Sequence, residues 1–362
     1  MKNFQLTRRQ MLKVVGAAGG GVAVSVLLGR IPGLAEDESD DIGLGPFGPW
    51  TEPQPILELA SSFTDYHPAI SKDEQSLYFT TTRFAQADPA YAAAIVVVQR
   101  PHRKATWDLD SLRLVSNLNS PNSIVGSPPK VVPHTTGVPN LTPKGHLIYF
   151  QSNRGGAGGD LYVSYRDDTR DDQAWNLPVL VPGALNTSSN SESAATYFRD
   201  PADGTVRMYF SRFAGIGSIG NPNQDFNIYV SYMAPDGTFD EGVLVPALNS
   251  VPQPGDAPGT WSRDTRTAIR RDGHEMFITS NRHGGLSYSG GPIENLWVAA
   301  RSDASTEDWN TPTLVPTINS GFGEGGPAIS WDGRTLYFFS ARTGAGTVGN
   351  WQLWTSTRDS LA

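Results

Sequence analysis

Short apolar strands alternate with polar turns along this chain, and the same succession of strands recurs through most of its length. In each copy a first strand ends in a turn such as Asp-Gly or Lys-Gly and leads into an alternating second strand, for example Leu77-Tyr78-Phe79-Thr80. Period-two alternation bounded by such turns predicts a β-hairpin. The first strands and their turns lie at residues 68–73, 139–145, 195–204, 267–273 and 327–333.

Two more strands complete each unit. A third follows a pattern such as Leu161-Tyr162-Val163, and a fourth opens at an aromatic residue and closes on Leu-Asn or Ile-Asn. One copy of the fourth strand, from Trp50 to Leu57, precedes the first unit, and the chain ends after the last third strand. We therefore predict an all-β, five-bladed β-propeller in which this N-terminal strand joins the last blade and leaves no long unpaired edge.

The repeat also resembles a known family. The pattern Pro-x-Leu/Ile-Ser/Thr…Asp/Lys-Gly…Tyr-Phe…Ser-x-Arg-x-Gly…Asp-Leu-Tyr-Val-Ser, clearest over residues 139–164, is similar to TolB-like, WD-like bacterial β-propeller repeats. The resemblance spans residues 50–362 and implies an envelope binding or assembly module. Propellers of this kind also include lyases and glycosidases, so the fold leaves the chemistry open.

The N-terminus has the features of an export signal. Arg8 and Arg9 precede an apolar run at residues 14–28, and Gly33-Leu34-Ala35 supplies small residues for cleavage. We predict a twin-arginine signal peptide over residues 1–35, an acidic Gly/Pro linker over 36–49 and the propeller over 50–362. Such a protein is periplasmic or secreted and has no stable membrane anchor after cleavage. An uncleaved N-terminal anchor is the alternative.

The amino-acid composition excludes several classes of site and partner. The 362 residues include 28 Lys and Arg against 36 Asp and Glu, a net charge of −8, and no Cys. The absence of Cys excludes disulfides, thiolate catalysis and Cys-ligated zinc. The acidic balance argues against a nucleic acid partner, because phosphate binding needs an excess of Lys and Arg.

The repeat is expected to bring charged side chains to one mouth of the central channel. In an up-and-down blade, the loop after the second strand and the connection into the next blade emerge on the same side. Carboxylates precede four of the five innermost strands, whereas the remaining one has Thr136. The carboxylates are Asp65, Glu192, Asp264 and Glu324, and the arginines that follow the second strands are Arg83, Arg154, Arg212, Arg282 and Arg342.

Two interpretations of these rings remain open. The arginines tie blades together through carboxylates and backbone carbonyls, or the oxygen ligands bind Ca²⁺ or another divalent cation. Departures from the repeat are more informative, because blade closure does not require them. The residues that depart from the repeat on the face of the channel mouth are His67, His134, Trp261, Arg263, Arg266 and His283.

Two classes of function follow. The first is a propeller that binds a small molecule, a carbohydrate or an envelope protein at the channel mouth. The second is a carbohydrate-active enzyme. A glycosidase would need two of the four carboxylates above, about 5–5.5 Å apart for retention or 6.5–9.5 Å for inversion. A lyase would use His67 or His134 as the base. In the lyase, Arg263 or Arg266 would neutralise a uronate carboxylate.

Overall fold

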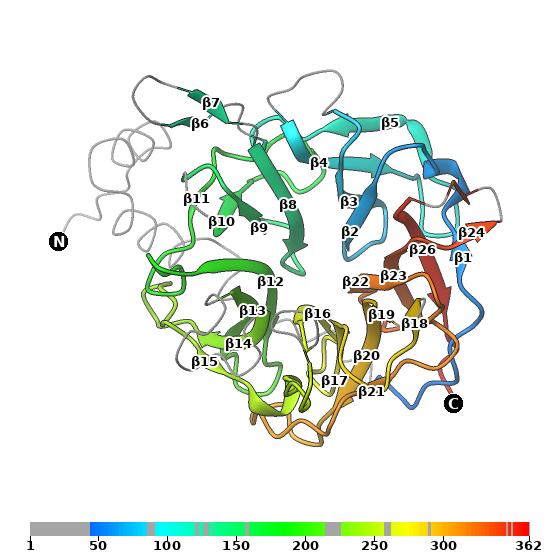
Figure 1. Ribbon diagram of the computed structural model, residues 1–362. Coiled ribbons are helices and arrows are strands. Elements are labelled where there is room, and N and C mark those ends of the chain that lie inside the picture. The colour runs from blue at the N-terminus through cyan, green and yellow to red at the C-terminus, as the bar shows by residue number, and fades with distance from the viewer. Residues whose placement is uncertain are drawn as a thin grey trace.

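The computed structural model consists of β-strands and turns, with the short 3-10 helices η1 (Leu57–Leu59) and η2 (Pro246–Leu248) (Figure 1). The predicted all-β class is confirmed. The structure describes residues 44–84, 91–119, 123–125, 130–132, 134–155, 159–213, 226–256, 262–288, 291–344, 347–348 and 350–361. The predicted signal peptide and most of the predicted linker lie outside these residues. Within the described ranges, no helix is long and apolar enough to cross a membrane.

Two sheets follow the predicted four-stranded pattern, in which each strand pairs antiparallel with the next along the chain. Their orders are β12-β13-β14-β15 and β16-β17-β20-β21. The bounds are β12 (Ser191–Arg199), β13 (Val206–Phe213), β14 (Phe226–Tyr232), β15 (Val243–Leu244), β16 (Asp264–Ile269), β17 (Glu275–Ser280), β20 (Asn295–Ala300) and β21 (Thr313–Leu314).

Two further units merge into one eight-stranded sheet, which the repeat does not predict. The nine residues of β4 extend beyond the six of β3, so Tyr91 and Ala93 reach β8 and pair with it in parallel. The strands are β2 (Asp65–Ile70), β3 (Ser76–Thr81), β4 (Tyr91–Gln99), β5 (Asp108–Leu114), β8 (His134–Leu141), β9 (Leu147–Ser152), β10 (Asp160–Tyr165) and β11 (Val179–Leu180).

The two ends of the chain share the last large sheet, of order β1-β26-β23-β22. The predicted strand from Trp50 to Leu57 contributes only β1 (Gln54–Pro55), which pairs with β26 (Gln352–Thr357). Pro53 and Pro55 have no N–H, which limits the ladder at this edge. The other strands are β22 (Glu324–Ile329) and β23 (Thr335–Ser340). The blade count and the closure of the ring stay predictions.

Three short two-stranded sheets lie outside these larger ones. They are β6 (Ser123–Val125) with β7 (Lys130–Val132), β18 (Ser287–Tyr288) with β19 (Gly291–Pro292), and β24 (Thr343–Gly344) with β25 (Thr347–Val348).

The large sheets are arranged around a common centre, and β2, β8, β12, β16 and β22 lie closest to it (Figure 1). Apolar side chains fill the spaces between neighbouring sheets; one cluster joins Tyr209 and Val230 to Ile278 and Trp297. Burial of this apolar surface stabilises the arrangement by roughly 25 cal/mol per Å². The packing holds the innermost strands side by side and so positions the central residues.

Candidate functional site

The four predicted carboxylates are fully buried, and each accepts a hydrogen bond from an arginine that the sequence placed on the same face. The Arg83 Nη2 atom lies 2.7 Å from Asp65 Oδ2, and Arg212 Nε lies 2.9 Å from Glu192 Oε1. Hydroxyl groups donate to the same carboxylates, as Ser61 and Thr81 do to Asp65. The remaining pairs are Arg282 with Asp264 and Arg342 with Glu324.

All five predicted arginines, Arg154 included, also donate to a backbone carbonyl group of a preceding loop. The carbonyls belong to Leu59, Leu118, Leu185, Leu248 and Ile318. In the remaining unit Thr136 stands at the position of the carboxylate, and Arg154 Nε donates to Ser152 Oγ. Burial lowers the pKa of Arg154 to about 10. The geometry therefore favours the architectural interpretation of these rings.

The described residues bring together no group of three His, Asp or Glu side chains that would hold a metal ion. The predicted ring carboxylates meet arginines rather than one another. These contacts disfavour a Ca²⁺ site built from the ring, because each carboxylate already accepts a hydrogen bond from a positively charged arginine.

A repeated irregularity marks the innermost strands. Each has a register shift near its start, and one residue there has a positive φ. For non-glycine residues this conformation is uncommon, and for a β-branched residue it is strained. Bulges of this kind redirect side chains and occur next to active sites. The five residues are His67, Val138, Ala194, Arg266 and Gly326, with φ between 47° and 59°.

A hydroxyl group from a second strand of another repeat unit accepts a hydrogen bond at three of these bulges. The backbone N–H of Val138 donates to Thr80 Oγ1, that of Arg266 to Ser211 Oγ, and that of Gly326 to Thr279 Oγ1. At the corresponding position of β23, next to His67, stands Phe339, which has no hydroxyl group. The His67 ring packs edge-on against the Phe339 ring, with 5.4 Å between centroids.

The imidazole of His67 is buried without a hydrogen-bond partner. The residue is only 5% exposed, and neither Nδ1 nor Nε2 has a partner. Burial, together with the positive charge of Arg266, holds the pKa of His67 well below its ordinary value. The ring is therefore neutral at pH 7, with one nitrogen free to accept a hydrogen bond and the other free to donate one.

Arg266 faces this histidine from β16 and pairs with a carboxylate that the sequence did not single out. Its Nη1 atom lies 2.9 Å from Glu294 Oε1, and Glu294 Oε2 is buried without a partner. Two glycines make room for these groups. A Cβ atom at Gly325 would lie 3.1 Å from Glu294 Oε2, and one at Gly326 would lie 2.9 Å from His67 Cδ2.

Aromatic rings enclose the remaining sides. The Tyr66 ring centroid lies 4.4 Å from that of His67 and 5.9 Å from that of Trp351. Phe339 stacks on Trp351 at 4.7 Å. Burial raises the pKa of Tyr66, so its hydroxyl group stays protonated. We refer to the following six residues as the channel cluster: Tyr66, His67, Arg266, Glu294, Phe339 and Trp351.

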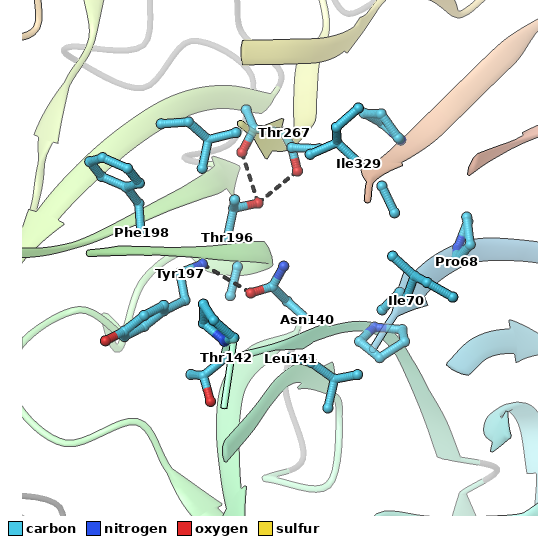
Figure 2. A pocket seen from close by; sticks show the side chains of 18 of the residues that line it. Pro68, Ile70, Asn140, Leu141, Thr142, Thr196, Tyr197, Phe198, Thr267 and Ile329 are labelled. Atoms are coloured by element: carbon cyan, nitrogen blue, oxygen red, sulfur yellow. Dashed lines mark hydrogen bonds between the residues drawn. The ribbon is translucent and has the colours of Figure 1, made fainter. Parts of the chain in front are cut away.

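A central cavity of about 140 Å³ begins at His67 and Arg266 and runs along the five innermost strands to their hairpin turns. Figure 2 shows side chains from several strands converging on it, among them Ile70, Asn140, Thr196 and Thr267. Thr267 Oγ1 donates to Thr196 Oγ1 across two sheets, at 3.0 Å. Of the described residues that line the cavity, none is a carboxylate.

Two other predicted residues, Arg263 and His283, are not among the described residues that line this cavity. The guanidinium of Arg263 lies over the Phe226 ring, and His283 Nε2 lies 2.8 Å from Asp256 Oδ2. His134 begins β8, but its side chain, like the whole of Trp261, lies outside what the structure describes. His67 and Arg266 are thus the predicted site residues that line the cavity.

Sequence reasoning missed Tyr66, Glu294, Phe339 and Trp351. One signal was present: Phe339 stands where three other second strands have Thr80, Ser211 and Thr279. The loss of a hydroxyl group next to the exceptional histidine is visible once the repeats are aligned. Glu294 and Trp351 belong to the loops before β20 and β26, where the units differ in length, so no alignment of repeats would have identified them.

Comparisons with known proteins identify a fold. No family model matches the chain, and no curated protein matches it. A thermostable family-43 glycoside hydrolase superposes with a TM-score of 0.54 at 16% identity, covering 83% of this chain and 90% of that chain. An α-L-arabinofuranosidase from Lactobacillus brevis gives 0.53 at 15% identity, with 84% and 94% covered. One from Podospora anserina, in complex with cellotriose, gives 0.50 at 11% identity, with 86% and 97% covered.

These similarities correct two predictions. The resemblance to TolB-like, WD-like proteins is wrong, because the similar solved structures are glycoside hydrolases and no family model supports TolB. The function implied by it, an envelope binding or assembly module, is wrong for the same reason. The repeat motif that carried the resemblance specifies hairpins and turns, which unrelated propellers share. At these identities the comparisons show a β-propeller type of fold and nothing of the chemistry.

Proposed function

We propose that this protein is a carbohydrate-active enzyme that binds a saccharide in the central cavity and acts on it at the channel cluster. The observation that carries the proposal is His67: a buried, neutral imidazole that lines a cavity and has no partner for either nitrogen. Leaving a buried polar group unpaired costs roughly 1–3 kcal/mol, so a ligand that supplies the missing hydrogen bonds gains that difference.

The cluster suits elimination from a uronate better than hydrolysis. Hydrolysis of a glycoside normally uses two carboxylates, and the four predicted ones are held by arginines. Elimination needs a base, a group that neutralises the carboxylate of the sugar and a proton donor. His67, Arg266 and Tyr66 supply these roles within one cluster.

In this reaction a nitrogen of His67 takes the proton from the carbon next to the uronate carboxylate. The electron pair of the broken C–H bond forms a carbon–carbon double bond, and the glycosidic oxygen leaves with its electron pair. The protonated hydroxyl group of Tyr66 gives its proton to that oxygen. The guanidinium of Arg266 stabilises the charge that spreads onto the carboxylate. The negative charge of the bound uronate offsets that of Arg266 and raises the pKa of His67 towards the working pH.

Hydrolysis is the second candidate, and Glu294 favours it. Its Oε2 atom is a buried carboxylate oxygen without a partner, next to Arg266. The similar solved structures are named as glycoside hydrolases.

An activity screen separates the two reactions. Purified protein is incubated with uronate polymers and with neutral arabinose- and xylose-containing polysaccharides. Unsaturated products with an ultraviolet absorbance support elimination, whereas saturated reducing ends without that absorbance support hydrolysis. Products of either kind that persist in His67→Phe and in Glu294→Gln would overturn the assignment to this cluster. No product from any polymer would overturn the enzyme itself.

Around this site we propose five four-stranded blades, with β1 completing the last blade and closing the ring. The pairing of β1 with β26 supports the closure. Export to the periplasm or the medium, based on Arg8 and Arg9, is part of the same proposal. We expect the Arg8→Lys/Arg9→Lys variant to lose export, and cell fractionation measures this loss.

A further inference from the structure

The central cavity is small for a saccharide-binding site. Its volume is about 140 Å³, whereas pockets for drug-sized ligands measure roughly 300–1,000 Å³. An apolar protein cavity of about 150 Å³ holds one benzene molecule, which is a single six-membered ring. One sugar ring therefore fills the space between His67 and Arg266 at one end and the hairpin turns at the other, and a second ring does not fit with it.

Hydrogen bonds between neighbouring sheets hold the walls of the cavity at a fixed spacing. The backbone N–H of Tyr197 on β12 donates to Asn140 Oδ1 on β8 at 3.0 Å. On the other side of β12, Thr196 Oγ1 donates to the carbonyl oxygen of Thr267 on β16 at 2.7 Å. Figure 2 shows these residues together at the cavity. Widening the cavity to admit more than one sugar would break these bonds, each of which contributes about 1 kcal/mol.

Proline stiffens the wall at three of the five bulges. Pro68, Pro139 and Pro327 directly follow the residues with positive φ on β2, β8 and β22, and all three line the cavity. The pyrrolidine ring fixes φ, and proline has no N–H to offer a ligand. Three of the five innermost strands thus present a rigid hydrocarbon ring at this level, so the shape of the wall limits what enters.

We infer that the enzyme takes a single terminal sugar into the cavity and cleaves, at the channel cluster, the bond that joins this sugar to the rest of the polymer. The inference rests on the proposed function and deepens it, because it makes the end of a saccharide chain the substrate. An internal sugar carries further sugars on both sides. Those on one side would have to share a cavity that one ring already fills.

The two candidate reactions place opposite ends of the saccharide in the cavity. Elimination from a 4-linked uronate breaks the bond between C4 and the glycosidic oxygen, so a uronate in the cavity is the reducing end and leaves as one unsaturated monosaccharide. Hydrolysis breaks the bond between C1 and the glycosidic oxygen. The hydroxyl group of water goes to C1 and its proton to the leaving oxygen. The sugar in the cavity is then the non-reducing end and leaves as one saturated monosaccharide.

Trisaccharides with one blocked end test the inference on the full-length protein. The probes are a 4-linked uronate trisaccharide and a xylose trisaccharide, each unblocked, reduced to the alditol at one end, or O-methylated at the other. We expect a monosaccharide and a disaccharide as the first products. Reduction should stop elimination, whereas methylation of the non-reducing end should stop hydrolysis. Turnover that neither block slows would overturn the inference.

Variants of the cavity wall locate the terminal sugar. Ile70 on β2 and Ile329 on β22 both line the cavity (Figure 2). Ile70→Phe and Ile329→Phe place a larger side chain there, and each should lower kcat/KM by roughly tenfold or more, because the sugar is displaced from the cluster. Leu180→Phe adds a ring on the outer strand β11, at a position that is 49% exposed, and should leave kcat/KM unchanged. Thermal unfolding verifies that each variant is folded. Folded Ile70→Phe and Ile329→Phe variants with unchanged kcat/KM would overturn the inference.

The proposed function and this inference fail in different ways. Calorimetric titration with free galacturonate and free xylose measures binding without turnover. Binding of either monosaccharide that Ile329→Phe weakens, without turnover of any polymer, would uphold a cavity for one sugar and overturn the enzyme. Turnover that depends on His67 and releases fragments of many lengths from within the polymer would uphold the enzyme and overturn the inference.

Discussion

Asp65 and His67 lie two residues apart on β2, and both are buried, yet their surroundings differ completely. Asp65 accepts hydrogen bonds from Ser61, Thr81 and Arg83. His67 has no partner at either ring nitrogen and lies against Phe339. Both carboxylate oxygens of Asp65 accept hydrogen bonds within the protein, whereas neither nitrogen of the His67 ring has a hydrogen-bond partner among the described residues.

The difference separates architecture from function. The contacts of Asp65 recur at Glu192, Asp264 and Glu324, so four of the five predicted units share them. The surroundings of His67 occur once and leave a polar group unsatisfied at a cavity, at a cost in stability. In a repeat protein, a buried polar side chain that is hydrogen-bonded in the same way in several units therefore indicates a structural contact. One that lacks hydrogen-bond partners in a single unit indicates a ligand site.

The largest expected effect is a loss of stability when the Asp65–Arg83 ion pair is broken. Asp65→Ala leaves the guanidinium of Arg83 without its buried carboxylate, which we expect to lower the free energy of unfolding by about 3–5 kcal/mol. Asp168→Ala breaks a solvent-exposed pair with Arg170 and should lower the free energy of unfolding far less than Asp65→Ala does. Urea unfolding measures both. Similar values for the two variants would show that Asp65 is not a tie.

His67→Phe should abolish activity on the substrate found by the polymer screen while leaving stability nearly unchanged. The substitution removes two unpaired nitrogens and breaks no hydrogen bond, so the change in unfolding free energy should stay within about 1 kcal/mol. His146→Phe is the matched control, because His146 Nδ1 lies 2.9 Å from the carbonyl oxygen of Arg166. It should lose stability and keep activity. A strongly destabilised His67→Phe would contradict the absence of a partner.

The pH dependence of stability tests whether His67 is buried as a neutral imidazole. Because the pKa of His67 is lowered in the folded protein, the unfolded chain binds a proton first as the pH falls. Stability is then complete above the ordinary value of about 6.5 and falls below it by up to about 1.4 kcal/mol per pH unit. The difference between wild type and His67→Phe in urea unfolding should show this loss. Parallel curves below pH 6.5 would exclude a neutral buried imidazole.

The smallest effect is expected at Tyr149, whose buried hydroxyl group has no partner. Tyr149→Phe should change the unfolding free energy by less than about 1 kcal/mol. Tyr78 is the counterpart in the preceding unit, where Asp172 accepts from its hydroxyl group and Arg166 donates to it. Tyr78→Phe should cost about 1–3 kcal/mol. Thermal unfolding of both variants measures the difference. Equal losses of stability would show that the hydrogen bonds of Tyr78 do not account for its contribution.

Much of the fold could be predicted from the repeat, because strand alternation and turn residues are local properties. Strand order determines where loops emerge, and on that basis the arginines and carboxylates were predicted to lie on one face. Predictions about the N-terminal strand were less accurate, because Pro53 and Pro55 reduce it to β1. The parallel pairing of β4 with β8 depends on strand length, which the pattern of Tyr91–Gln99 does not delimit.

The sequence by itself determined the all-β class, the order of the strands and the exceptional position of His67 in the repeat. Only the tertiary structure decided which polar groups are satisfied. Glu294 reaches Arg266 from a loop, and Trp351 approaches Tyr66 from the far end of the chain. Hydrogen bonding and burial depend on neighbours in space, and in this fold the neighbours of an innermost strand come from other sheets.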